Sequence, residues 1–330
     1  MDYLKTNLLF YLNPLLKKLL ILGASGFIGK NFAMFFSKKK DFQLTGTYFR
    51  KKTFIKNVKM VQCDLTKKKD TDKVIRDSNI IIQAAATTSG AKDILAKPYI
   101  HVNDNAIINS MVTRSAYDYN VKHVIVFSCS LMYQSSKKPL KESDFNPSDN
   151  IYPNYFGAGL MKVFVEKMCE FYSRLGKNKY TLIRHSNIYG PNDKFDLKKS
   201  HVLAASVNKV INCKNNKVII WGEGKEERDL LYISDLVNFV DLAIKKQKNK
   251  YELYNVGSGQ LISVNELIKT IIKISGKKIT AINDLTKKSL KTFVCLNCHK
   301  AKREFQWFPK VSLENGIKKT IDWYLKNKNN

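Results

Sequence analysis

Short strand-like runs alternate with helical patterns along the first half of the chain. Residues 19–22 form the first apolar run, and apolar side chains then recur at 28, 32, 35 and 36, which is helical spacing. Further strand-like runs stand at 44–48, 59–63, 80–86, 123–127 and 180–184, with helical patterns at about 105–119 and 157–175. This alternation predicts an α/β fold with a doubly wound parallel sheet of the Rossmann type.

The second half of the chain predicts a smaller unit built around the first. We expect a helix over 201–212, a strand at 217–221 and a strand near 254–257 that returns to the main sheet. The predicted units are an N-terminal extension (1–17), a dinucleotide-binding Rossmann domain (18–190, with 231–257 returning to it) and an interleaved substrate-binding lobe (191–230 and 258–330).

The long helix at 157–175 has an apolar stripe, which we predict to face the core. The stripe consists of Met161, Phe164, Met168, Phe171 and Leu175.

A glycine-rich turn joins the first predicted strand to the first predicted helix. Such a turn brings free backbone N–H groups and the positive end of the helix dipole to a pyrophosphate. Glycine leaves room for the turn and for close helix-on-strand packing. We therefore predict a dinucleotide site formed by Gly23, Ser25, Gly26, Phe27, Ile28 and Gly29.

The second predicted strand indicates which dinucleotide is bound. An NAD-preferring site usually has an acidic residue at the end of this strand, for the ribose 2′-hydroxyl. Here the strand continues into Phe49-Arg50-Lys51-Lys52, without a carboxylate. We predict NADP, with Arg50 contacting the 2′-phosphate because its planar fork matches that group. NAD is the alternative if these residues are only one more basic turn.

Charge and cysteine content narrow the class of protein. The 57 Lys+Arg residues against 28 Asp+Glu give a net charge of +29, which would suit nucleic acid or an anionic membrane. The lysines are spread over the whole length, however, so we expect solvated faces and neither of those partners. Six scattered cysteines indicate a reducing cytoplasm, and the lone pair Cys295 and Cys298 lacks the second pair of a zinc site, so no metal is expected.

Several motifs together resemble a known family. They are the three glycines, the run Ser128–Tyr133, Asn187-Ile188-Tyr189-Gly190-Pro191 and Arg228-Asp229-Leu230-Leu231-Tyr232. The set resembles the extended short-chain dehydrogenases, the nucleotide-sugar epimerase/dehydratase family. The stretch from Asn187 through His201 and Trp221 to Arg228 is most similar to GDP-L-fucose synthases.

The resemblance implies roles for further residues and a homodimer built from the 105–119 and 157–175 helices. It places Asp64, Leu65, Ala84, Ala85, Ala86 and Asn105 against the cofactor, Lys162 on the nicotinamide ribose, and His201 on the sugar. It assigns Asn187, Lys209, Trp221 and Arg228 to the nucleotide-diphosphate pocket. The implied substrate is a nucleotide sugar, GDP-linked.

The catalytic pattern of the family is altered in this chain. The family's Tyr lies four residues before its Lys on one helix, yet position 158, four before Lys162, is alanine. Cys129 stands where a hydroxyl is usual, beside Ser130, and Leu131 replaces the cysteine base of the fucose synthases. We predict a GDP-4-keto-6-deoxy-sugar reductase/epimerase-like oxidoreductase in which Cys129, Ser130 or a water relays the proton. The alternatives are a nucleotide-sugar epimerase or dehydratase of other specificity, and a catalytically impaired nucleotide-sugar-binding protein.

Overall fold

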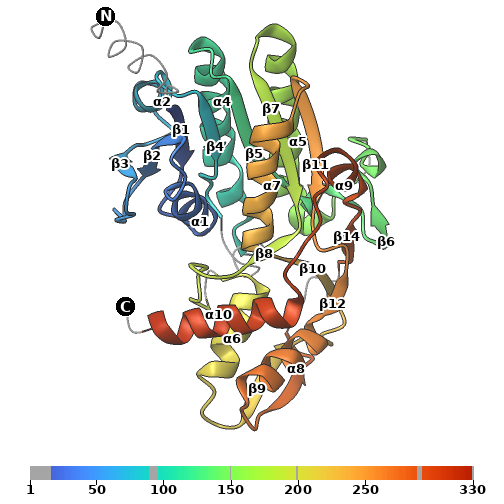
Figure 1. The fold of residues 1–330 in the computed structure, drawn as a ribbon. Coiled ribbons are helices and arrows are strands. Elements are labelled where there is room, and N and C mark those ends of the chain that lie inside the picture. The colour runs from blue at the N-terminus through green and yellow to red at the C-terminus, as the bar shows by residue number, and fades with distance from the viewer. Residues whose placement is uncertain (1–15, 89–95, 149, 198–199, 288–291, 329–330) are drawn as a thin grey trace, which may run out of the picture.

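A parallel sheet of seven strands is the centre of the molecule (Figure 1). The computed structural model describes residues 16–88, 96–148, 150–197, 200–287 and 292–328, so most of the predicted N-terminal extension lies outside the described residues. The strand order is β11-β7-β5-β4-β1-β2-β3, and every neighbouring pair is parallel. The predicted Rossmann-type fold is confirmed. The strands are β1 (Lys17–Leu22), β2 (Phe42–Tyr48), β3 (Lys59–Gln62), β4 (Ile80–Gln83), β5 (His123–Cys129), β7 (Lys179–His185) and β11 (Tyr251–Val256).

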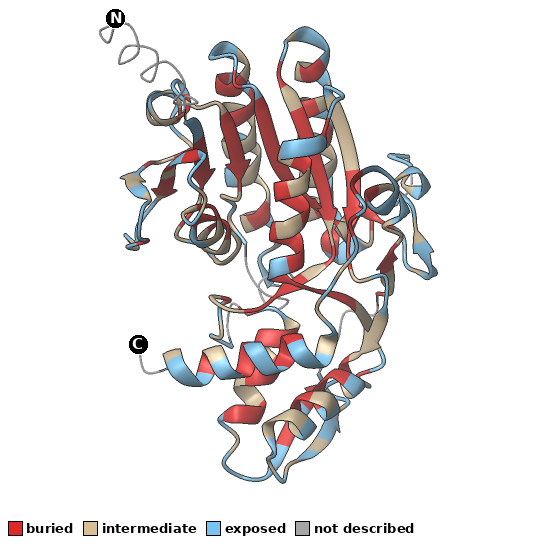
Figure 2. Cartoon of the chain, in the orientation of Figure 1, coloured by how far each residue is buried: buried red, intermediate tan, exposed pale blue. Residues whose placement is uncertain are grey.

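Helices cover both faces of this sheet. Side chains alternate along β1, so Leu19 and Ile21 pack under α1 (Phe27–Phe36) and α7 (Ile233–Lys246). Leu20 and Leu22 pack on the other face, under α2 (Lys68–Ile75), α4 (Asn103–Asp118) and α5 (Phe156–Leu175). Because both faces are covered, the central strands are buried almost throughout (Figure 2).

A second group of elements lies beyond the carboxyl ends of the strands (Figure 1). A three-stranded sheet, β12-β10-β8, links it to the main body, and β9 pairs with β13 while β6 pairs with β14. Helices α6, α8 and α10 pack together beside these strands, and α9 lies against β11 and α7 of the main body. The elements are β6 (Ser136–Leu140), β8 (Asn187–Tyr189), α6 (Val202–Ile211), β9 (Lys217–Trp221), β10 (Glu227–Tyr232), β12 (Leu261–Ser263), α8 (Val264–Ser275), β13 (Thr280–Asp284), β14 (Val294–Leu296), α9 (His299–Phe305) and α10 (Leu313–Asn327).

The buried face of α5 differs from the predicted one. The helix buries Gly159, Val165, Glu166, Cys169 and Ser173. The predicted stripe was therefore wrong as a core face: Phe171 is 54% exposed and Leu175 is 55% exposed, and Met161, Phe164 and Met168 are only partly buried. The reason is that smaller side chains of α5 pack on the sheet, and its large apolar side chains point away from it.

Two further features of the structure concern membrane-spanning helices and the oxidation state of the cysteines. No helix within the described ranges is long and apolar enough to cross a membrane. All six cysteines are free thiols.

Candidate active site

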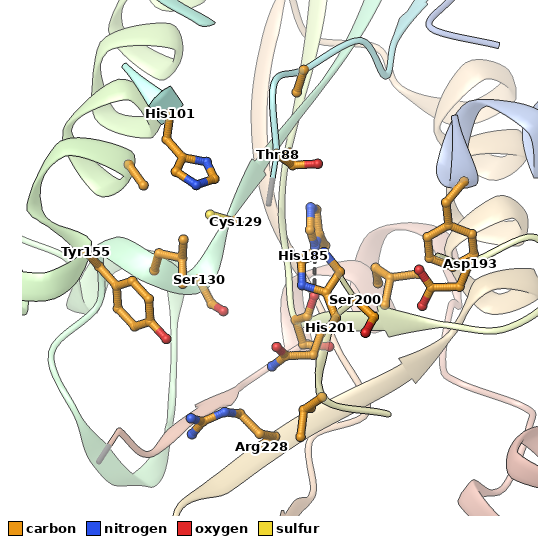
Figure 3. Close-up of a pocket in the computed structure, with 18 of the residues that line it drawn as sticks. Thr88, His101, Cys129, Ser130, Tyr155, His185, Asp193, Ser200, His201 and Arg228 are labelled. Carbon is orange, nitrogen blue, oxygen red and sulfur yellow. Dashed lines mark hydrogen bonds between the residues drawn. The ribbon is translucent and has the colours of Figure 1, made fainter. Parts of the chain in front are cut away.

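A cavity of about 620 Å³ opens at the carboxyl edge of the main sheet, lined by residues of the sheet and of the second group of elements. The structure brings most of the predicted site residues to its wall. Those lining it are Gly26, Phe27, Ile28, Ala84, Ala85, Ala86, Asn105, Cys129, Ser130, Lys162, Asn187, His201, Lys209, Trp221 and Arg228. Figure 3 shows His185 and His201 in the middle of this cavity, with Ser130 and Tyr155 toward α5.

The glycine turn forms a tight cradle at the N-terminus of α1. Gly23 has a φ of 75°, and a side chain there would bring a carbon within 2.7 Å of the Ala85 Cα. A side chain at Gly29 would overlap the Gly23 carbonyl, so α1 packs against the turn only because both residues are glycine. Gly26 N–H donates to the Gly23 carbonyl at 3.0 Å. This geometry fits a pyrophosphate held by backbone N–H groups.

Six predicted cofactor residues lie outside the cavity wall. Gly23, Ser25 and Gly29 belong to the turn behind it, and Arg50, Asp64 and Leu65 follow the ends of β2 and β3. Arg50 is exposed and lies 5.2 Å from the ring of Phe49. Asp64 accepts hydrogen bonds from the backbone N–H and the hydroxyl of Thr66, which lowers the pKa of its carboxyl.

Asn105 fixes the loop that follows β4. Its side chain accepts from Thr87 N–H at 2.9 Å and donates to the Thr87 carbonyl at 2.9 Å. It also donates to the carbonyl of His101, the last residue of the 3-10 turn η1 (Pro98–His101), at 2.8 Å. Asn105 therefore holds the backbone of one cavity wall in place.

Lys162 and Cys129 both line the part of the wall formed by β5 and α5, called the floor of the cavity below. Lys162 Nζ donates to the Phe127 carbonyl at 3.0 Å. Burial raises the pKa of the Cys129 thiol, although the Lys162 charge partly opposes this, so the thiol is protonated at neutral pH. Ala158, one turn before Lys162, also lines the cavity and offers only a methyl group.

A buried ionic network lies directly behind this floor. Arg184 binds Glu166 through two hydrogen bonds, of 2.9 and 2.7 Å, and donates to the Tyr133 hydroxyl at 2.9 Å. Ser128 donates to the same Glu166 carboxylate at 2.6 Å. The network joins β5, β7 and α5, and so holds Cys129 and Lys162 rigidly relative to each other.

Two histidines line the middle of the cavity: His201, which was predicted, and His185, which was not. Burial lowers the pKa of His185 to about 4, and its Nδ1 lies 2.7 Å from the Ser186 carbonyl. His201 is accessible from the cavity but enclosed by protein on its other sides, which lowers its pKa, as do Lys194 and His101. Both imidazoles are therefore neutral at pH 7, which suits proton acceptance better than proton donation.

Several residues of the cavity wall were not predicted from the sequence. Among them are His101, Tyr155, His185, Asp193, Ser200 and Glu226. For Tyr155, burial raises the pKa of the phenol and the Arg228 charge opposes this. His185 directly follows the predicted strand at 180–184, a position that could have suggested it. Nothing in the local pattern distinguishes His101, Asp193 or Ser200.

Asp193 is held beside the first turn of α1. Asn31 of that helix donates to the carbonyls of both Phe27 and Pro191, each at 2.9 Å. Burial raises the pKa of the Asp193 carboxyl to about 7. Within the part of the chain that the structure describes, neither Asp193 Oδ2 nor the hydroxyl of Ser200 has a hydrogen-bond partner.

The predicted diphosphate-pocket residues converge on the opposite wall. Lys209 Nζ donates to the Ile219 carbonyl at 3.0 Å and lies 5.6 Å from the ring centre of Trp221. Arg228 donates to the Thr292 carbonyl at 2.7 Å, and Asn187 donates to the Asp229 carbonyl at 3.2 Å. Two cations and an indole face thus share one wall with Asn187.

This fold and cavity define a dinucleotide-binding α/β protein with a second ligand pocket beside the dinucleotide turn. The model of the NAD dependent epimerase/dehydratase family matches residues 19–257. The chain belongs to this family, as the resemblance in the sequence predicted.

Individual relatives agree with that assignment. The GDP-L-colitose synthase of Yersinia pseudotuberculosis is 28% identical over 320 residues, covering 95% of this chain and 99% of the relative. GDP-L-fucose synthase 1 of Arabidopsis thaliana is 28% identical over 272 residues, which cover 81% of this chain and 83% of the relative. In fold, the chain is similar to the UDP-glucose 4-epimerase of Thermotoga maritima, with a TM-score of 0.84 and 24% identity over 94% of this chain and 99% of that one.

Proposed function

We propose that this protein is an NADP-dependent oxidoreductase that acts on a nucleotide sugar, most like a GDP-4-keto-6-deoxy-sugar reductase. The observation that carries this proposal is one continuous cavity. It joins the glycine cradle of α1 to the cationic wall of Lys209, Trp221 and Arg228, with Lys162 lining it as well. The names of the GDP-L-colitose and GDP-L-fucose synthases among its relatives support a GDP-linked substrate.

The chain's own residues divide the binding work. When bound, the nicotinamide would supply the hydride. The turn of Gly23, Gly26 and Gly29 would hold the pyrophosphate, and Lys162 the nicotinamide ribose. Arg228 and Lys209 would bind the sugar diphosphate by charge, because guanidinium and ammonium groups pair strongly with phosphate. Arg50, exposed after β2, supports NADP because no carboxylate is there to repel a 2′-phosphate.

Proton transfer has to proceed without a phenol at position 158. We propose that Ser130, Cys129 or a water donates to the sugar oxygen, because both side chains line the cavity and the thiol keeps its proton. Leu131 has no ionisable group, and inversion needs one group to take a proton from the sugar carbon and another to return one on the opposite face. We propose that His201, whose neutral imidazole can accept a proton, and the protonated Cys129 thiol share these two tasks.

A second candidate is a protein that binds a nucleotide sugar without turning it over. Ala158 favours it, because loss of a general acid typically costs about 10²–10⁴-fold in rate. A nucleotide-sugar epimerase or dehydratase of other specificity is the third, supported by the UDP-sugar epimerases among the relatives in fold and sequence.

NADPH oxidation with GDP-4-keto-6-deoxy-mannose, followed by NMR of the product, separates these candidates. Oxidation well above the protein-free rate supports the reductase, and the NMR shows whether C3 and C5 are inverted. Tight NADPH binding without turnover of this sugar contradicts the reductase assignment. Turnover of a UDP-sugar in its place supports the third candidate.

We also propose a homodimer through α4 and α5. Ile107, Leu160, Phe171 and Leu175 are large apolar side chains exposed on these two helices, and such patches mark interaction sites. Light scattering after gel filtration should give twice the mass of 37.9 kDa.

We propose a cytoplasmic location as well, because free thiols are consistent with a reducing compartment.

A further inference from the structure

Glu226 lies on the connection between β9, which ends at Trp221, and β10, which begins at Glu227. Its carbonyl accepts a hydrogen bond from Val264 N–H at 3.1 Å, which extends the β10–β12 ladder by one step. Side chains alternate along such a ladder, so Glu226 shares a side with Arg228. Figure 3 shows Arg228 in the cavity, and Glu226 lines the same cavity.

The carboxylate of Glu226 is poorly placed for a site that only binds phosphate. It is half-buried, and no residue of the described ranges forms an ion pair or a side-chain hydrogen bond with it. A negative charge two residues from Arg228 weakens the field that attracts a diphosphate. Its place in the wall is explained if the ligand presents hydrogen-bond donors there, because an ionised carboxylate only accepts.

Trp221 provides the neighbouring surface for a planar ring. The indole is 43% exposed and lines the cavity. Lys209 lies over the ring at 5.6 Å, anchored by its bond to the Ile219 carbonyl, and so holds the indole in place. A base stacked on Trp221 would share this wall with Glu226, which lies on the connection that follows Trp221 in the chain.

We propose that Glu226 selects guanine, its two carboxylate oxygens accepting hydrogen bonds from N1–H and from the 2-amino group. This inference rests on the proposed nucleotide-sugar function and names the base. Guanine is the common base that presents two adjacent donors on one edge, which matches a carboxylate. Uracil presents a single N–H between two carbonyl oxygens, and those oxygens would be repelled.

Calorimetric titration of the whole protein with GDP, IDP and UDP tests this assignment. IDP lacks only the 2-amino group, so it reports one of the two hydrogen bonds. We expect wild-type protein to bind GDP more tightly than IDP, and IDP more tightly than UDP. Glu226→Gln should weaken GDP binding roughly 10- to 100-fold, the range for losing a bidentate base contact. The variant should weaken IDP binding less and should not weaken UDP binding, because the charge that repels the uracil oxygens is gone.

Glu223→Gln is the matched control. Glu223 is an exposed carboxylate on the same connection and pairs with Lys225, so its replacement should change no base preference. NADPH binding by each variant shows that the fold is intact. Equal affinity of the wild type for GDP and UDP, or an equal loss of affinity for both in Glu226→Gln, overturns the proposed role of Glu226. Either result leaves the proposed function of the protein standing. Absence of binding by all three nucleotides, with NADPH still bound, overturns the proposed function and this inference with it.

Discussion

Replacement of Asp193 by asparagine should stabilise the protein at high pH. The side chain is 8% exposed, and burial raises the pKa of its carboxyl from an ordinary 3.8 to about 7. Between these two values the unfolded chain loses the proton while the folded chain keeps it. The free energy of unfolding therefore falls as pH rises from about 4 to about 7. At 1.36 kcal/mol per pKa unit, the full loss is about 4 kcal/mol.

Asparagine removes this penalty because it cannot ionise, and its oxygen can still accept the 2.7 Å bond from Lys194 N–H. Urea unfolding at pH 4.5, 6 and 8 measures the effect. The variant should gain about 1 kcal/mol over wild type at pH 4.5 and up to about 4 kcal/mol at pH 8. Asp77→Asn, at an exposed site, is the control and should show no such trend. An effect of Asp193→Asn that is independent of pH, or a loss of stability at pH 8, would refute the reasoning.

Two further substitutions test the floor and the cradle of the site. Glu166→Gln leaves the Arg184 guanidinium buried without its carboxylate. The free energy of unfolding, measured by urea titration, should therefore fall by about 3–5 kcal/mol. A loss below about 1 kcal/mol would show that the pair is not important for stability. Gly29→Ala places a methyl group against the Gly23 carbonyl, so NADPH affinity in fluorescence titrations should fall by about tenfold or more. Met34→Ala, exposed on the same helix, should bind NADPH normally, and unchanged binding by Gly29→Ala would contradict the cradle geometry.

The sequence by itself determined the order and type of the main elements. Strand and helix periods are local properties, so the runs at 19–22, 123–127 and 180–184 could be recognised without tertiary information. The glycine turn was equally visible because its residue spacing is set by backbone geometry. Element ends were less accurate: β4 stops at Gln83, although the apolar run continues to residue 86.

Only the tertiary structure decided which side chains share the cavity and what charge they have. Asp193 and Ser200 come from loops and His101 ends the short turn η1, and in neither kind of segment does periodicity mark a buried position. The buried face of α5 depended on the sheet and on α4, which is why its large apolar stripe faces outward. The neutral state of His201 and the raised pKa of Asp193 follow from enclosure by segments distant in sequence. Burial is a property of the assembled fold, and it determines the chemistry of this site.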